Sequence, residues 1–332
     1  MKETGIPSET AGTLRSDNNV QSARKKSLQS WILLFVCNLM WSLQFTCIKL
    51  VQDQVGAYFT VWAPMLLSTL MLLPFILKGF TKEKERGWKD IWTFGTLALL
   101  GAFPAQVIMT WGTQYSLASN AAILTLTLPV LTAFFAFLLL HEKMNTVRWI
   151  SFSIAIVGVL LCSSGDIGKL DFSSNYALGN LLIFIAIVGN AYYNIGCKKI
   201  ADRYSAIEMI FFTYVAMIVF LTPLVFYFEP QIFSTIPSFT TQTWIGLALL
   251  TFFHNFLSMI LFFNALKVLE GIQVALSNYL ITFFGLPVAA IWLGESLSGW
   301  TIIGGCLVLA GTLVMTFGDY QASRIKSTVK NY

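Results

Sequence analysis

Ten apolar stretches of about 20 residues follow one another along the chain, separated by short polar segments. A helix of that length crosses the hydrocarbon core of a bilayer. Backbone amides in lipid must find partners within their own segment, so each stretch is predicted to be an α-helix. The runs are too long, and lack the alternation, for membrane β-strands. The pattern predicts an all-α membrane protein with spans near residues 31–50, 57–77, 91–111, 118–140, 147–164, 177–197, 206–228, 243–263, 271–292 and 300–317.

The basic residues predict how the spans are oriented. If the N-terminus is cytoplasmic, 19 of the 21 Lys and Arg residues fall on the cytoplasmic side, and only Lys49 and Lys169 fall on the other. This asymmetry follows the positive-inside rule and places both termini in the cytoplasm. The cytoplasmic set is Lys2, Arg15, Arg24, Lys25, Lys26, Lys78, Lys82, Lys84, Arg86, Lys89, Lys143, Arg148, Lys198, Lys199, Arg203, Lys267, Arg324, Lys326 and Lys330.

Composition supports the same class. The chain is 56% hydrophobic and only 11% charged, which excludes an ordinary soluble domain. The basic pI of 8.9 is explained by the cytoplasmic loops, so no nucleic-acid partner is predicted. Residues 1–30 are polar and predict a disordered cytoplasmic tail, and residues 318–332 predict a second cytoplasmic tail. The first span is too long for a cleavable signal, so it is expected to stay as an anchor in the cell (plasma or inner) membrane.

An internal repeat divides the spans into two sets of five. An offset of 153 residues pairs identical residues across the halves, and an offset of 149 places Lys49 on Lys198. The identical pairs are Ala122/Ala275, Ala136/Ala289, Leu140/Leu293, Glu142/Glu295, Ile150/Ile303, Gly158/Gly311 and Leu160/Leu313. Because five is odd, the repeats 31–164 and 177–317 must enter the membrane in opposite directions. Inverted repeats are typical of transporters that open a central site to each side in turn.

Several short motifs carry a family resemblance. The first span holds Trp41-Ser42-Leu43-Gln44-Phe45 followed by Ile48-Lys49. The two halves hold Leu140-His141-Glu142-Lys143-Met144 and Leu293-Gly294-Glu295-Ser296-Leu297, and the sixth span ends in Lys198-Lys199. Over residues 31–317 this layout resembles the drug/metabolite transporter superfamily, of the EamA type. The resemblance implies ten helices in two inverted five-helix repeats, and transport of small molecules with export as the commoner direction.

The motifs also depart from that family's pattern. His141 stands where the acidic turn usually has a glycine, and Trp62-Ala63-Pro64 stands where many members carry an arginine. A substrate role for that arginine therefore does not carry over to this chain.

Polar residues inside the spans are the candidate substrate contacts, because such residues tend to face a cavity or another helix. Amide and aromatic side chains of this kind suit a small-ligand site, with helix packing as the alternative role for each. The predicted set is Asn38, Trp41, Gln44, Gln106, Asn190, Tyr193, His254, Asn255 and Asn278.

His254 is also the candidate for proton coupling. It lies near the middle of the eighth span, and an imidazole with an unperturbed pKa near ~6.5 can exchange protons at physiological pH. The alternative is a neutral imidazole that makes a hydrogen bond between helices.

Four charged residues are predicted to have structural roles. Glu142 and Glu295 lie at turns, where a carboxylate accepts bonds from the amides that begin the following helix; a proton relay is the alternative. Lys49 and Lys198 are expected to reach the interface or to bond the last carbonyls of their own helices. The glycines at 304, 305 and 311 predict close packing within the monomer, with a homodimer contact as the alternative.

No catalytic, metal or cofactor pattern emerges, and the chain is predicted not to be an enzyme. It lacks the glycine loop that cradles phosphates and the HExxH pattern of zinc proteases. The sequence predicts a secondary transporter of a small organic metabolite or amphipathic compound, such as an amino acid or a drug. Its expected partners are the bilayer, the substrate and protons. The alternatives are an exchanger of phosphorylated metabolites or nucleotide-sugars, and a lipid-modifying enzyme built around His141 and Glu142.

Overall fold

The computed structural model describes residues 26, 28–79, 88–140, 145–164, 175–200, 203–269, 274, 277–296, 299–300, 302–311 and 313–314. Seven of its helices are long and apolar enough to cross a membrane. They are Leu28–Val51, Ala57–Lys78, Trp92–Tyr115, Ala118–Leu139, Tyr176–Lys198, Ala206–Phe228 and Thr241–Val268. Three shorter apolar helices, Thr146–Gly158, Leu280–Leu293 and Ile302–Gly311, coincide with parts of the fifth, ninth and tenth predicted spans, and the first two extend one residue beyond them.

The long spans are assembled from shorter elements. Two π-helical segments, η1 (Ala98–Ala102) and η5 (Leu250–Leu257), and two 3₁₀ segments, η2 (Thr125–Thr127) and η4 (Ile236–Ser238), connect the α-helices. The α-helices are α2 (Gln44–Val51), α3 (Ala57–Gly79), α4 (Trp88–Leu97), α5 (Phe103–Tyr115), α6 (Ala118–Leu124), α7 (Leu128–Leu140), α8 (Thr146–Ser164), α9 (Asn175–Ile200), α10 (Ala206–Phe228), α11 (Ile232–Thr235), α12 (Thr241–Leu249), α13 (Ser258–Val268) and α15 (Tyr279–Leu293).

The predicted boundaries differ from the observed ones mainly at the ends. The first helix already includes Leu28, so the last residues of the predicted tail 1–30 are helical. The eighth span continues to Val268, five residues beyond its predicted end. Most of both predicted tails lies outside the described residues.

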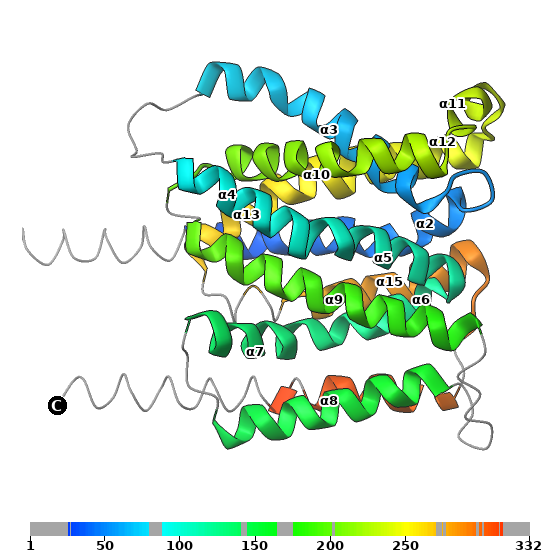
Figure 1. The fold of residues 1–332 in the computed structure, drawn as a ribbon. Coiled ribbons are helices and arrows are strands. Elements are labelled where there is room, and N and C mark those ends of the chain that lie inside the picture. Colours follow the sequence, from blue (N-terminus) through cyan, green and yellow to red (C-terminus); the bar gives the residue numbers. More distant parts are fainter. Residues whose placement is uncertain are drawn as a thin grey trace, which may run out of the picture.

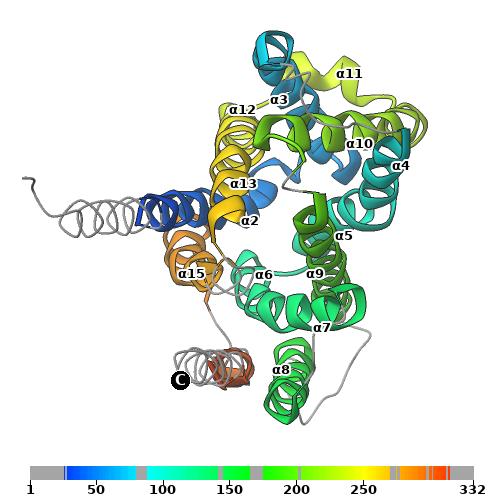
Figure 2. The ribbon, with the colours of Figure 1, turned by 90° about the vertical axis from the view of Figure 1, so that its left-hand side faces the viewer.

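The spans lie roughly along one common axis, in alternating directions, and form a single bundle (Figure 1). Viewed along the helices, α5 and α9 lie side by side within it (Figure 2). Their contact is very close: a Cβ on Gly112 would lie 2.8 Å from the carbonyl oxygen of Gly179, and a Cβ on Gly179 would lie 2.8 Å from that of Gly112. Beside this contact the Ser116 hydroxyl bonds the Asn180 amide oxygen at 2.5 Å. Small residues thus let two backbones touch, as is common in membrane helix pairs.

The helix at 302–311 packs beside α8 at one edge of the bundle (Figures 1 and 2). A Cβ on Gly305 would lie 2.9 Å from the Ile123 side chain, and one on Gly311 would lie 2.9 Å from the Ser151 carbonyl oxygen. A Cβ on Gly158 would lie 2.7 Å from the carbonyl of Gly304. These glycines therefore serve packing within the chain, while the homodimer stays a prediction.

Large apolar side chains cover the outside of the bundle. Ile291 is 86% exposed and Phe283 is 70% exposed, both on α15, and Leu77 on α3 is 74% exposed. Side chains of this kind would form an apolar patch in water, whereas in a bilayer they contact acyl chains.

Candidate functional site

A cavity of about 100 Å³ lies among the spans, and polar and aromatic side chains line it. Six of the nine predicted substrate contacts meet there: Trp41, Gln44, Gln106, Asn190, Tyr193 and His254. They come from four spans far apart in the sequence. The remaining lining residues are Phe45, Met109, Thr125, Leu128, Asn194, Met259, Phe262 and Ile281.

Two polar atoms at this cavity are buried without a hydrogen-bond partner among the described residues. They are Nε1 of Trp41 and Nδ1 of His254. Other polar groups of the lining are engaged: the Gln44 amide donates to Oε1 of Gln106 at 3.3 Å, and the Tyr193 hydroxyl donates to Thr213 at 3.0 Å. Buried polar atoms in proteins are nearly always hydrogen-bonded, so each of these two exceptions requires an explanation.

The other three predicted contacts do not line this cavity. Asn278 borders a smaller space of about 20 Å³, and two residues, Asn194 and Phe262, border both. The Asn38 amide donates to the Leu34 carbonyl at 2.8 Å and to the Ser277 hydroxyl at 2.9 Å. These bonds give Asn38 a contact between the first and ninth spans.

Asn255 has a local role in its own helix. Its side-chain amide donates to the Leu250 carbonyl at 2.8 Å, and the Tyr214 hydroxyl donates to the Asn255 carbonyl at 2.8 Å. Both carbonyls belong to η5, where the wider π turn disturbs the regular backbone bonding. Asn255 and Tyr214 thus stabilise the irregular segment that carries His254.

Four of the spans that line the cavity are broken at its level, whereas the sixth, α9, is continuous. The first span has a turn at Leu43, the third contains η1, and the eighth contains η5. The fourth contains η2 because Pro129 has no N–H for the Thr125 carbonyl, which bonds the N–H of Leu128 instead. Irregular backbone at membrane depth is tolerated where it is buried in protein or lines a cavity.

The two halves contribute equivalent positions to the cavity. The 149-residue and 153-residue offsets relate six pairs of lining residues. Under the 153-residue offset, η1 corresponds to residues 251–255, which lie inside η5. The pairs are Trp41/Asn190, Gln44/Tyr193, Phe45/Asn194, Gln106/Met259, Met109/Phe262 and Leu128/Ile281. His254 corresponds to Gly101, whose Cβ position is only 3.0 Å from Cβ of Tyr193. The cavity therefore lies where the two repeats meet.

The two lysines bond a different helix from the one expected. The Lys49 ammonium donates to the Gln114 carbonyl at 3.0 Å, at the end of α5. The Lys198 ammonium donates to the carbonyls of Leu266 and Leu269 at 2.8 and 3.1 Å, at the end of α13. Each lysine thus caps the third helix of its own repeat and not its own helix. Lys198 also borders the smaller cavity, so a cation does lie close to the site.

Glu295 likewise bonds a helix other than the following one. Its carboxylate accepts the N–H groups of Ala118 and Ser119 at 2.9 and 2.8 Å, at the start of α6. Leu117 at the N-cap of α6 offers no side-chain bond, so Glu295 supplies the missing acceptor from the other repeat. Its repeat partner Glu142 lies outside the described residues.

Sequence reasoning missed a second carboxylate of this kind. Glu229 follows α10 directly and accepts the N–H groups of Tyr58 and Phe59 at 3.0 and 2.9 Å, at the start of α3. Burial raises the pKa of Glu229, and the two amide bonds oppose part of that shift. An acidic residue immediately after an apolar run is the signal that Glu229 shares with Glu295.

An ion pair with a buried carboxylate connects the repeats at the opposite end of the bundle. Asp90 at the start of α4 is only 4% exposed. Its carboxylate lies 2.7 Å from Nη1 of Arg203 and accepts the Tyr204 hydroxyl at 2.8 Å. The sequence reading did not single out Asp90, because it lies at the end of a span where charge is common.

The family comparison decides the class of protein. The model of the EamA-like transporter family matches residues 29–164 and again residues 177–317. The chain belongs to the EamA-like transporter family. This EamA-like protein is therefore a multi-pass integral membrane transporter, with the two-repeat architecture that the sequence predicted.

Individual relatives are distant but nearly full-length. The uncharacterized transporter YetK of Bacillus subtilis is 24% identical over 90% of this chain and 89% of its own. A probable terminal-alkyne amino-acid exporter of Streptantibioticus cattleyicolor is 25% identical over 92% of this chain and 98% of its own. One solved crystal structure shares the fold, with a TM-score of 0.63 and 14% identity over 88% of this chain and 98% of that one.

Proposed function

We propose that this protein is a secondary transporter that moves a small organic metabolite through the central cavity by alternating access. The observation that carries the proposal is the pair of unpartnered atoms, Trp41 Nε1 and His254 Nδ1, beside one cavity. A substrate with hydrogen-bonding groups would satisfy both. The broken helices around it and the related lining positions support a site that the two repeats reshape together.

The lining also favours a class of substrate. The described residues at the central cavity are amides, aromatics and apolar side chains, together with Thr125 and His254, and no Lys, Arg, Asp or Glu is among them. This composition suits a neutral or zwitterionic amphipathic compound, and the relative named an amino-acid exporter supports an amino acid or a derivative. It disfavours phosphorylated metabolites and nucleotide-sugars. The nearest cation at the smaller space, Lys198, already donates to two carbonyls.

We further propose ten membrane spans with both termini in the cytoplasm. The three shorter apolar helices complete the five-plus-five layout, and the basic loops set the direction. Enzymatic reporters fused to the C-terminus and to the loop between the seventh and eighth spans test this. The proposal expects a reporter that works only in the cytoplasm to be active at the C-terminus and inactive in the loop. A reporter that works only outside the cytoplasm should give the opposite result.

Uptake into liposomes that contain the purified protein tests the function. The assay uses a panel of amino acids and neutral metabolites, with and without a proton gradient. His254→Gln keeps a hydrogen-bonding side chain but does not titrate, so the proposal expects transport that no longer responds to the gradient. Unchanged gradient dependence in His254→Gln would refute coupling by His254 while leaving the transport proposal intact.

A second variant tests the cavity itself. Trp41→Phe removes the indole N–H and keeps most of the ring, so loss of one hydrogen bond should raise the KM up to about tenfold. Trp92→Phe is the matched control, because Trp92 is 67% exposed on the surface. Equal KM values for the two variants would show that the substrate does not bond Trp41.

A further inference from the structure

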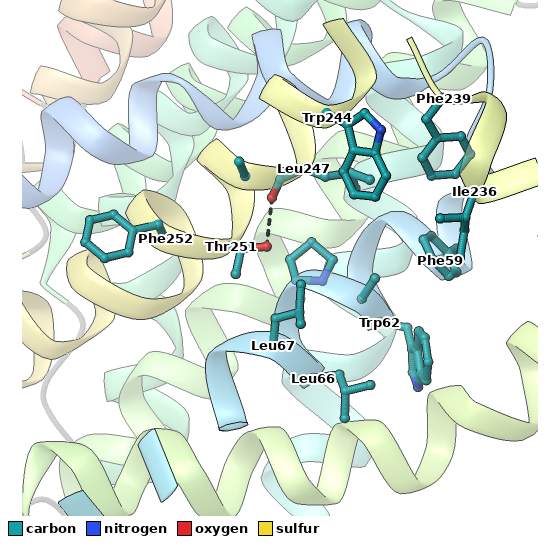
Figure 3. A pocket seen from close by; sticks show the side chains of 13 residues that line it. Phe59, Trp62, Leu66, Leu67, Ile236, Phe239, Trp244, Leu247, Thr251 and Phe252 are labelled. Atoms are coloured by element: carbon teal, nitrogen blue, oxygen red, sulfur yellow. Dashed lines mark hydrogen bonds between the residues drawn. The ribbon is translucent and has the colours of Figure 1, made fainter. Parts of the chain in front are cut away.

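A second and larger pocket of about 560 Å³ lies apart from the central cavity (Figure 3). One wall is α3, from Phe59 to Leu67, and the other is α12 and η5, from Trp244 to Phe252. Ile236 and Phe239, from the segment between α11 and α12, complete its lining.

The walls of this pocket offer hydrocarbon contacts. Three of its residues carry side-chain donors. Two of the donors are already engaged: the Trp62 indole donates to the Thr222 hydroxyl at 2.9 Å, and the Thr251 hydroxyl donates to the Leu247 carbonyl at 2.7 Å. The third donor belongs to Trp244, which is 49% exposed at the rim of the pocket. Away from that rim, a ligand with polar groups would lose its hydration without compensation, which costs free energy. An alkyl chain has no such groups.

The pocket is continuous with the surface that faces the bilayer. Both walls belong to membrane spans, and the lining residues Leu67, Trp244 and Phe252 are 49%, 49% and 42% exposed. The first and last lining residues of each wall are eight positions apart in the sequence, which corresponds to about 12 Å along a helix. The pocket is thus elongated along the helices, and in a bilayer the acyl chains run in that same direction.

We propose that this pocket binds an acyl chain of a bilayer phospholipid. The bilayer supplies such chains at the exposed rim, and their shape and chemistry match the elongated apolar walls. The headgroup would remain at the interface, outside the pocket.

The bound chain would contact the same segment that forms the central cavity. Thr251 and Phe252 line the pocket, and His254 in the same π segment lines the cavity. The Ser68 hydroxyl on α3 also bonds the Thr251 carbonyl at 3.0 Å, so α3 and η5 are joined directly beneath the pocket. A lipid chain bound in the pocket would therefore contact the same backbone segment that positions His254.

Photo-crosslinking in nanodiscs tests the proposal without any transport substrate. The full-length protein is reconstituted with a phosphatidylcholine that carries a diazirine on its acyl chain, irradiated, digested and mapped by mass spectrometry. The proposal expects adducts concentrated in residues 59–67 and 236–252. Ala248→Trp fills the pocket and should abolish most of these adducts, whereas Val219→Trp, at a 64% exposed position on α10, should not.

Two further results bear on the outcome. Ala63→Leu is a milder filling variant, and it should lower the labelling in the same region if Ala248→Trp does not fold. Labelling that follows side-chain exposure evenly over all spans, or that persists in both filling variants, would overturn the proposal. Crosslinks between two protein chains at this pocket, in place of lipid adducts, would assign it to a second copy and would also overturn it.

Discussion

Replacing Glu295 tests whether its carboxylate is a helix cap or a proton relay. The carboxylate accepts two amides at 2.9 and 2.8 Å from the start of α6, a helix whose own N-cap residue provides no acceptor. Glu295→Ala leaves both amides without this partner. The variant should therefore destabilise the protein while changing no residue of the central cavity.

The magnitude follows from the two bonds. Bonds to a charged group contribute about 1.5–3 kcal/mol each when water cannot compete. Glu295 is only partly buried, so the measured range for helix N-caps, about 0.5–2 kcal/mol, is the better guide, with about 0.3–1 kcal/mol more from the helix dipole. We expect about 2 kcal/mol for Glu295→Ala and about 1 kcal/mol for Glu295→Gln, which keeps one acceptor oxygen.

Thermal unfolding in detergent, followed by intrinsic fluorescence, measures the effect. A loss of about 2 kcal/mol corresponds to a melting temperature lower by about 3 °C for a chain of this length, and Glu295→Gln should lose about half as much. Asp53→Ala removes an exposed carboxylate from the same end of the bundle and serves as the control, with an unchanged melting temperature. Glu295→Gln that melts like the wild type but loses its response to a proton gradient would refute the cap and establish the relay.

Three further substitutions test other contacts. Gly112→Val should separate α5 from α9 and prevent stable folding, which size-exclusion chromatography measures as loss of the monodisperse peak. Gly95→Val is the control, because a Cβ at Gly95 meets nothing within 4 Å, and it should elute as the wild type does. Asn255→Leu removes the side-chain bond to the Leu250 carbonyl in η5 and should cost about 1 kcal/mol, measured as a lower melting temperature; an unchanged value would mean that η5 does not need this bond. Asp90→Asn removes an ion pair whose arginine is 48% exposed, so we expect a loss of only about 1 kcal/mol, which 1 M salt should reduce; a loss that is unaffected by salt would contradict an electrostatic role.

The spans could be predicted because hydropathy and length are local properties of the sequence. For that reason α3, α6 and α10 begin at the predicted residues, Ala57, Ala118 and Ala206. The breaks are different. Pro129 explains η2, but η5 contains neither proline nor glycine, and one of its carbonyls is bonded by Tyr214 from another helix. A contact over that distance in the sequence is not visible in a local pattern.

The candidate site shows the same division between local and long-range information. Asn38, Trp41 and Gln44 follow one another at intervals of three residues, which predicts that they share one face of the first helix, and Trp41 and Gln44 both border the cavity. Asn38 shares that spacing, but its amide bonds Ser277 in a span more than two hundred residues away. The polarity of a residue indicates that it avoids lipid, whereas whether it faces a cavity or a neighbouring helix depends on the assembled bundle.

The correspondence of His254 with Gly101 has a kinetic consequence for transport. If the two halves were chemically identical around the substrate, the outward-facing and inward-facing forms would bind it equally well. Here one half presents an imidazole where the other presents only a hydrogen atom, and the six paired lining positions also carry different side chains. The half-saturation concentrations measured from the two sides of the membrane should therefore differ. The maximal rates must differ in the same ratio, because a passive carrier produces no net flux when the concentrations on both sides are equal.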